Sequence, residues 1–188
     1  MTNQKWLELF NYWGVLTMTQ MTSADAIKYN LAARIFHWIG ALLIVLAWFL
    51  IEQGEDYLSL HKSIGVSFLI WTLLRIVNRV LTKDPAPLPV SKIHTITANV
   101  VHLALYAAMI VMPLTAFLAS MYGGYGINIF GVMNISGFET TNDELAGRLM
   151  DWHTDLVWPI LLALVAAHII GALYHQFILK DNILSRMR

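Results

Sequence analysis

The chain has no cysteine and few charged residues. The absence of cysteine excludes disulfides, iron–sulfur clusters held by thiolates, thiolate-ligated haem and covalent c-type haem attachment. Charged residues make up 13% of the chain and hydrophobic residues 57%, whereas soluble domains carry about 25% charged residues. The formal net charge is +0, so there is no basic surface of useful size and we expect no nucleic-acid partner.

Charge is missing from three long stretches. No Asp, Glu, Lys or Arg lies between Arg34 and Glu52, between Lys92 and Glu139, or between Asp155 and Lys180. A helix needs about 20 apolar residues to cross a bilayer core roughly 30 Å thick. Four apolar segments of that length can be drawn, at about 31–51, 60–81, 95–122 and 152–179. They are too long for spanning strands and rich in Leu, Ala and Ile, so the sequence predicts an all-α membrane protein, a four-transmembrane-helix bundle.

The charges in the loops predict the orientation of the bundle. The first and third loops are mainly acidic and contain Glu52, Glu55, Asp56, Glu139, Asp143, Glu144 and Asp151. Basic residues lie before the first segment, around the second loop and at the C-terminus, namely Lys28, Arg34, Arg75, Arg79, Lys83, Lys92, Lys180, Arg186 and Arg188. By the positive-inside rule, both termini are cytoplasmic and the first and third loops lie outside. Lys62 and Arg148 are the basic exceptions on the outer side.

The connecting segments carry their own signals. The second loop, residues 82–90, contains three prolines and is predicted to be a stiff, extended connector. The third loop begins with a glycine-rich turn at 123–126. Further on, Asn142 followed by Asp143 and Glu144 predicts the start of a short surface helix before the fourth segment.

Residues 1–27 are predicted to be an N-terminal extension, and residues 28–188 a four-helix domain. Two interpretations of the extension stay open. Its aromatic and leucine residues, from Trp6 to Leu16, suit an amphipathic helix at the membrane interface. Alternatively, the start codon is assigned too far upstream and Met21 is the real first residue.

Seven histidines stand out in this apolar chain. An ionisable side chain inside a span is costly and by default suggests a functional site. A single intramembrane histidine is often only a hydrogen-bonded core residue. Five or six of them in four spans are poorly explained in that way.

Depth sorts four of the histidines into two pairs. His153 starts the fourth segment on the outer side, and His168, 15 residues later, lies roughly 22 Å deeper. His61 shares the outer level with His153, and His37 shares the inner level with His168. Two pairs at two levels are what two b-type haems with two axial histidines each require. Another tetrapyrrole, such as chlorophyll, would fit nearly as well, whereas zinc is less suited because its ligands cluster at one depth.

Two further histidines on the cytoplasmic half are candidates for a quinone site. His102 lies level with His37, where it is a competing ligand, a supporting or quinone-facing residue, or a plain core histidine. His175 follows His168 by seven residues and suits quinone binding or proton handling, or is an interfacial histidine with no specific role. His94 lies at the membrane edge, where we expect it to be solvated.

Haem propionates need cationic partners near the membrane surfaces. Arg34, Arg75 and Arg79 are candidates at the inner haem, because the planar guanidinium group matches a carboxylate. Lys62 and Arg148 are their outer counterparts. Topology signalling explains the same residues equally well.

Short motifs surround these histidines in a specific order. They are, along the chain, Phe36-His37-Trp38, His61-x-x-x-Gly65, Arg75 with Arg79, His102-Leu103 with Tyr106, Met112-Pro113-Leu114, Trp152-His153, His168, Tyr174-His175 and Lys180-Asp181-Asn182-x-Leu184-x-Arg186-Met187. The pattern resembles the bacterial cytochrome b561 family and covers roughly residues 28–188. The resemblance implies a four-helix di-haem protein of the bacterial inner membrane, with His37 and His168 on one haem and His61 and His153 on the other.

The spacing in the fourth segment departs from that family. Its members place the two ligands of this segment one residue closer together than His153 and His168. The difference predicts a one-residue insertion near Trp158-Pro159, accommodated as a π-bulge.

The resemblance also implies a function, transmembrane electron transfer linked to the quinone pool. On this hypothesis the chain is an oxidoreductase that takes electrons from a periplasmic one-electron donor and reduces ubiquinone. Superoxide is a candidate donor, because Lys62 and Arg148 would attract an anion. The alternative is an electron-relay or anchor subunit that serves a separate redox protein. A homodimer stays open, although no Gly-x-x-x-Gly motif lies within the spans.

Overall fold

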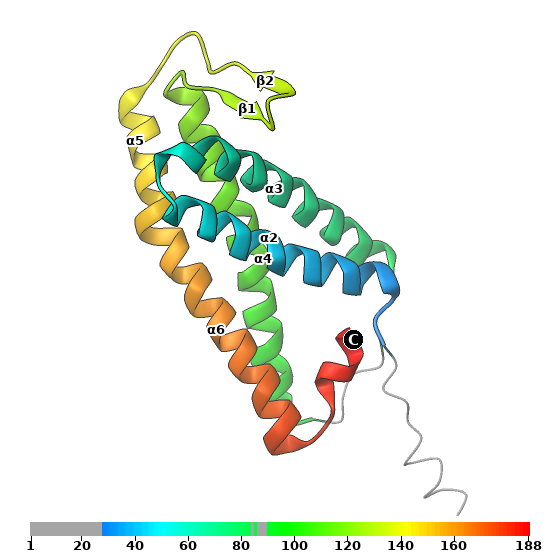
Figure 1. Ribbon diagram of the computed structural model, residues 1–188. Coiled ribbons are helices and arrows are strands. Elements are labelled where there is room, and N and C mark those ends of the chain that lie inside the picture. The colour runs from blue at the N-terminus through cyan, green and yellow to red at the C-terminus, as the bar shows by residue number, and fades with distance from the viewer. Residues whose placement is uncertain (1–27, 84, 86–89) are drawn as a thin grey trace, which may run out of the picture.

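Four long helices that run in alternating directions make up most of the structure (Figure 1). The computed structural model describes residues 28–83, 85 and 90–188. The predictions for residues 1–27 and for most of the second loop lie outside these residues. The first three long helices are α2 (Leu31–Glu52), α3 (Leu58–Leu81) and α4 (Lys92–Tyr122). A single 3₁₀ turn, Glu55–Tyr57, joins α2 to α3.

The fourth span is a composite helix. It consists of α5 (Asp143–Asp151), a π-helix (Trp152–Val157), α6 (Trp158–Tyr174) and a second π-helix (His175–Leu179). The predicted surface helix is confirmed as α5, whose N-cap Asn142 accepts a hydrogen bond from the main-chain N–H of Leu145 at 2.9 Å. α5 continues directly into the span. Within the described residues, four helices are long and apolar enough to cross a membrane, so the predicted all-α architecture is confirmed.

The first π-helix confirms the predicted π-bulge, directly before Trp158. In a regular α-helix, 15 residues turn about 60° beyond four full turns. One π-type turn takes up an additional residue, so the 15 residues from His153 to His168 rotate like about 14 residues of α-helix. Both histidines can therefore face the interior of the bundle.

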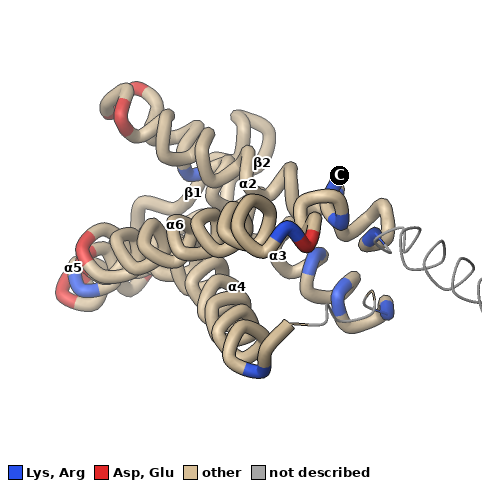
Figure 2. The backbone as a smooth tube through the Cα atoms, turned by 90° about the horizontal axis from the view of Figure 1, so that it is seen from below, with Lys and Arg blue, Asp and Glu red and all other residues tan. Residues whose placement is uncertain are grey.

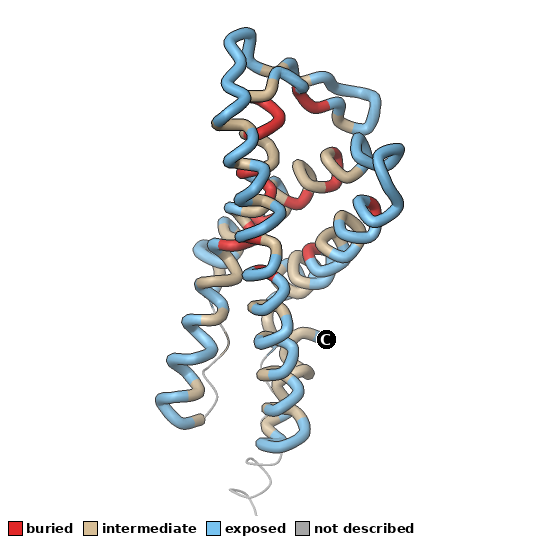
Figure 3. Tube along the Cα trace, turned by 90° about the vertical axis from the view of Figure 1, so that its left-hand side faces the viewer, coloured by how far each residue is buried: buried red, intermediate tan, exposed pale blue. Residues whose placement is uncertain are grey.

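Helix contacts divide the bundle into two pairs. α2 packs along α3 and α4 along α6, and α3 also contacts α4. The shared core is a cluster of four buried residues, Phe68, Ala108, Met109 and Leu161. α4 has no buried residue before Ala108 and α6 has none after Leu161, and the structure describes both helices throughout. The helices are thus closely packed toward one end and diverge toward the other (Figures 1 and 3).

Charge distinguishes the two ends of the bundle (Figure 2). Lys and Arg gather where α2 begins, α3 ends and the C-terminus lies, and most Asp and Glu lie at the opposite end. The C-terminal tail is attached to α2 at the basic end. The indole Nε1 of Trp38 donates to the main-chain oxygen of Met187 at 2.8 Å, and the guanidinium of Arg34 donates to that of Arg188. The basic, open end is therefore the inner end, and the closely packed end is the outer one.

The outer loop after α4 folds into a small antiparallel hairpin. Strand β1 (Ile127–Ile129) pairs with β2 (Met133–Ile135), with Asn128 opposite Asn134. The sequence predicts only the preceding turn at 123–126, because strands of three residues carry too little alternation to be recognised. β1 contacts α3, so the hairpin lies beside the outer end of a membrane-spanning helix.

The π-helix leads to a first prediction. We expect deletion of Leu156, which is exposed on this turn, to convert it to a regular α-helix while the chain keeps its bound haem. The reason is that the two histidines of the fourth span then have the spacing that a regular helix needs to place them on one side. Haem per purified chain, measured as the pyridine haemochrome, tests this expectation.

An additional alanine inserted after Leu156 is the matched control. It rotates His153 by about 100° relative to His168, and the haem content should fall clearly. If the deletion variant lost as much haem as the insertion variant, the π-helix would have no role in aligning the two histidines.

Candidate functional site

The structure brings together the two histidine pairs that depth predicts. The ring centres of His61 and His153 are 6.3 Å apart, and those of His37 and His168 are 6.1 Å apart. Two imidazoles that bind one metal ion from opposite sides, each at about 2 Å, have ring centres about 6 Å apart. Each pair therefore has the separation that a shared iron requires.

Hydrogen bonds determine which nitrogen of the outer pair can bind a metal. The Nδ1 of His61 lies 2.8 Å from the main-chain oxygen of Ala47 on α2, and the Nδ1 of His153 lies 2.7 Å from that of Met112 on α4. A carbonyl oxygen can only accept, so Nδ1 carries the proton in both rings. The unprotonated Nε2 is then left as the ligand, which is the usual arrangement at metal-bound histidines.

The outer pair lines a deep apolar cavity of about 260 Å³. Its walls include Trp48, Met112 and Trp158, and its floor reaches Phe68 and Leu161 of the buried core. Apart from the two histidines, few polar groups line it. A planar apolar macrocycle held between two imidazoles fits a cavity with this lining.

Three histidines meet at the inner level. His37 from α2 and His102 from α4 both lie beside His168 of α6, with ring centres 6.1 Å and 5.3 Å from that of His168. Only the separation of His37 from His168 matches the distance across a shared metal ion. His102 is the closer neighbour but an exposed one, so its position suits a residue that supports His168 rather than one that faces it across an iron.

Arg75 interacts directly with the inner pair. Its Nη2 lies 3.2 Å from the Nδ1 of His37, and its guanidinium lies over the ring of Tyr106 at 5.4 Å from the centroid. A guanidinium can only donate, so this Nδ1 accepts and the proton is on Nε2. Binding of iron by Nε2 requires the opposite tautomer. Arg75 would then turn away from His37, and its guanidinium would become available to a carboxylate.

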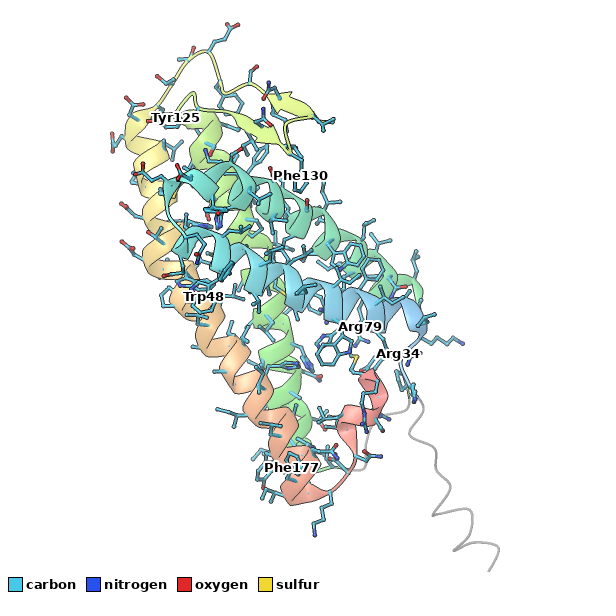
Figure 4. The ribbon with its side chains drawn as sticks, viewed as in Figure 1. Arg34, Trp48, Arg79, Tyr125, Phe130 and Phe177 are labelled. Carbon is cyan, nitrogen blue, oxygen red and sulfur yellow. The ribbon has the colours of Figure 1, made fainter. Side chains whose placement is uncertain are left out.

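The other predicted cationic partners divide between the two levels. Arg34 and Arg79 lie at the inner end near the C-terminal tail (Figure 4), where Arg79 stacks over the ring of Tyr29 at 5.8 Å. Lys62 lines the outer cavity and a second, open pocket next to it. Arg148 does not line the outer cavity; it lies 3.9 Å from Glu144 on the solvent side of α5. Lys62 is therefore the outer basic residue that the structure places at the site.

A separate polar cluster occupies the inner end of the fourth span. The Nδ1 of His175 and a carboxylate oxygen of Asp181 are 2.5 Å apart, and both side chains are largely buried. The ring of His94 lies 5.6 Å from that of His175. His94, expected to be solvated, is half-buried here instead. His175 and His102 thus belong to different clusters, one at the inner surface and one beside His168.

Sequence reasoning missed the partners in this cluster. Asp181 lies only six residues after His175. A turn at the end of the helix would bring the two together, so this contact could have been predicted from the sequence. The position of His94 next to His175 could not be predicted from the sequence, because it depends on how α4 packs against the fourth span. The contact of Arg75 with His37 could not be predicted for the same reason, since it also joins two helices.

Comparison with known proteins identifies the group to which these sites belong. A family profile described as prokaryotic cytochrome b561 matches residues 28–188. Cytochrome b561 homolog 2 of Escherichia coli (strain K12) is 32% identical over an alignment of 177 residues that covers 85% of this chain and 90% of the relative. Cytochrome b561 homolog 1 of the same strain is 28% identical over an alignment of 163 residues that covers 80% of this chain and 91% of the relative.

A third relative carries a functional name. The probable superoxide oxidase CybB of Yersinia pestis is 27% identical over an alignment of 169 residues that covers 85% of this chain and 95% of the relative. The profile covers the whole helical domain, including all four long helices. The chain therefore belongs to the prokaryotic cytochrome b561 family, multi-pass inner-membrane proteins that bind b-type haem and transfer electrons across the membrane.

Proposed function

We propose that this chain binds two b-type haems, one between His61 and His153 and one between His37 and His168, and carries electrons from an outer donor to a quinone at the inner side. The observation that carries the proposal is the nearly equal separation of the two ring pairs, 6.3 Å and 6.1 Å, at two depths of one bundle. A haem held by each histidine pair would supply a one-electron couple.

The residues between the two levels support electron transfer without leakage of water. Phe68, Met109 and Leu161 are buried, and Leu161 lies about midway between His153 and His168 along the fourth span. A closely packed apolar layer has no space or hydrogen-bond partners for water or hydrated ions. Electrons can cross such a layer, whereas protons cannot.

Basic residues near both histidine pairs are available to bind the carboxylates of haem propionates. At the inner level Arg75 is the main candidate for a propionate, because it already lies beside His37. Arg34 and Arg79 are at the same end and add positive charge. At the outer level Lys62 takes this role, since it lines the cavity of the outer histidines. A paired carboxylate and guanidinium or ammonium is far less costly within a span than either charge alone.

The pair formed by His175 and Asp181 suits the acceptor end. Conversion of a quinone to a quinol takes two electrons and two protons, and the protons must come from the inner side. A histidine hydrogen-bonded to a carboxylate can hold and transfer a proton, and this one lies where the fourth span meets the inner surface. We propose that His175 contacts the quinone, with His102 as a second candidate at the level of His168.

Superoxide is the proposed donor. It would give up one electron and leave as dioxygen. Lys62 supports this choice, since it lines both the outer cavity and the open pocket beside it, and a basic side chain raises the rate at which an anion arrives. The name of the Yersinia pestis relative supports the same donor. The alternative is a relay subunit that receives electrons from a separate periplasmic protein.

Haem stoichiometry tests the cofactor assignment. We expect two haems per unaltered chain, one in His61→Ala and one in His168→Ala, because each variant leaves one pair intact. His102→Gln should keep both, since His102 is not the residue that faces His168 across the iron. Pyridine haemochrome analysis of protein purified in detergent measures these values. Full haem content in His37→Ala together with loss in His102→Gln would exchange the roles of the two residues.

Quinone reduction tests the acceptor site. His175→Ala should slow reduction of a ubiquinone analogue roughly 100-fold, the contribution typical of a positioned proton donor, while the haem content stays unchanged. Phe177→Leu is the matched control, because Phe177 lies on the same π-helix but is exposed (Figure 4). An unaltered rate in His175→Ala would favour the relay subunit over a quinone reductase.

Anaerobic stopped-flow reduction by superoxide tests the donor. We expect Lys62→Gln to slow reduction roughly tenfold, because the loss of a basic group near the site lowers the arrival rate of an anion. Arg148→Gln should have little effect, because Arg148 is paired with Glu144 away from the cavity. If superoxide left the unaltered protein oxidised, it would not be the donor.

A further inference from the structure

The tip of the outer hairpin is apolar and exposed. Phe130, Val132 and Met133 are 52%, 90% and 59% exposed. They lie at the turn of the hairpin, where the main-chain N–H of Val132 donates to the main-chain oxygen of Ile129 at 3.0 Å. Water would surround three large apolar side chains here if the hairpin extended into solution, which is unfavourable. Among residues 28–83, 85 and 90–188, none covers these three side chains.

The hairpin lies beside the spanning helix α3 at the level of the membrane boundary. The buried hydroxyl of Ser63 donates to the main-chain oxygen of Asn128 at 3.1 Å and accepts from the N–H of Phe130 at 3.0 Å. Ser63 is in the second turn of α3 and only two residues from His61. The candidate span runs from Glu55 to Leu81, 27 residues, or about 40 Å of helix. Since the bilayer core is roughly 30 Å thick, Ser63 lies near or within its outer edge.

The charge pattern of the outer loop agrees with this depth. No Asp, Glu, Lys or Arg lies between Gly126 and Phe138. The neighbouring helix α5 begins with Asp143 and Glu144 and is exposed to solvent. The two halves of the same loop thus differ: the acidic half suits water and the uncharged hairpin suits lipid. Ile70 and Leu74, on the spanning part of α3, are exposed and apolar as well.

The backbone of the tip is unfavourable for its sequence. Phe130 has a φ of 50° and Gly131 a φ of 74°, so both central residues of the turn are left-handed, as in a type I′ hairpin turn. Asn is the usual residue at the first of these positions, and a bulky aromatic residue there is an outlier. A strained conformation that displays an apolar side chain is evidence that the side chain has a role where it stands.

We propose that the hairpin tip, Phe130–Met133, inserts into the outer interfacial layer of the bilayer and anchors the hairpin there. Figure 4 shows Phe130 beside α3, on the outer part of the molecule. Aromatic and aliphatic side chains are favourable in this layer, where apolar groups leave water and nearby main-chain groups stay hydrated. This proposal does not rest on the electron-transfer function proposed above.

The anchor positions the hairpin residues that cover the outer site, which we call its roof. Ile127 of β1 is buried and lines the cavity of the outer histidine pair. Tyr125, Gly126 and Asn128 line the adjacent open pocket of about 330 Å³, together with Lys62. The ring of Tyr125 lies 6.0 Å from the Nζ of Lys62. A hairpin held by lipid at its tip and by Ser63 at its base keeps these residues over the site.

The cysteine-free chain permits a direct test. A nitroxide is attached to Val132→Cys in the full, haem-loaded protein, reconstituted in bilayer discs of phosphatidylethanolamine and phosphatidylglycerol. Collision rates with dioxygen, which concentrates in lipid, and with a water-soluble nickel complex are measured by power-saturation EPR. Leu74→Cys, exposed on the spanning part of α3, is the lipid control, and Glu144→Cys on α5 is the aqueous control.

We expect the label at position 132 to collide more often with dioxygen than with the nickel complex, as at position 74. More frequent collision with the nickel complex, as at position 144, would overturn the proposal and leave the tip free for a soluble partner. Spin–spin broadening that disappears when labelled chains are diluted with unlabelled ones would also overturn it, because the tip would then contact a second copy.

A second measurement tests the roof. A nitroxide at Tyr125→Cys should become more mobile in bilayers when Val132→Asp is added, because a carboxylate at the tip cannot stay in the lipid layer. Val132→Ala, which stays apolar, should leave the mobility unchanged. Equal mobility in all three proteins would show that the tip does not hold the roof.

Discussion

Two imidazoles that share one iron have to face each other with ring centres about 6 Å apart, and all four spanning helices contribute to that distance. The outer pair joins His61 of α3 to His153 of the fourth span, and main-chain oxygens of α2 and α4 hold both rings by Nδ1. A carbonyl oxygen in a helix has a second lone pair, so it can accept the imidazole N–H without loss of its helical hydrogen bond. The rings are therefore oriented by main-chain groups rather than by other side chains.

The outer histidine pair lies in a more closely packed part of the bundle than the inner pair. The outer level is roofed by a hairpin and closed at its floor by Phe68 and Leu161. At the inner level the helices diverge and His102 is exposed. The guanidinium of Arg75 is hydrogen-bonded to the Nδ1 of His37. Polar groups there have more freedom to rearrange when a propionate or a quinone binds. On the proposed function, the closely packed level would take up electrons and the more open level would deliver them to the quinone.

The bundle and the spatial pairing of the histidines were largely predictable because they depend on local and one-dimensional properties. Uncharged runs of about 20 residues identify the spans, loop charges identify their direction, and these two together determine the depth of each histidine. The π-helix at Trp152–Val157 was predicted from the family resemblance, because His153 and His168 lie one residue further apart than the resemblance implies. Asn142 could be recognised as a cap from its neighbours alone.

Contacts between distant segments could not be predicted in this way. The depth of a residue does not specify the direction of its side chain, so Lys62 and Arg148 looked equivalent until the structure placed one at the cavity and the other against Glu144. The nearness of His94 to His175, and of Ser63 to the hairpin, likewise depends on how helices pack. The sequence by itself determined the number, direction and composition of the spans, because the bilayer imposes these on each segment separately. Only the tertiary structure decided which side chains share a site, because that choice depends on the rotation of each helix against its neighbours.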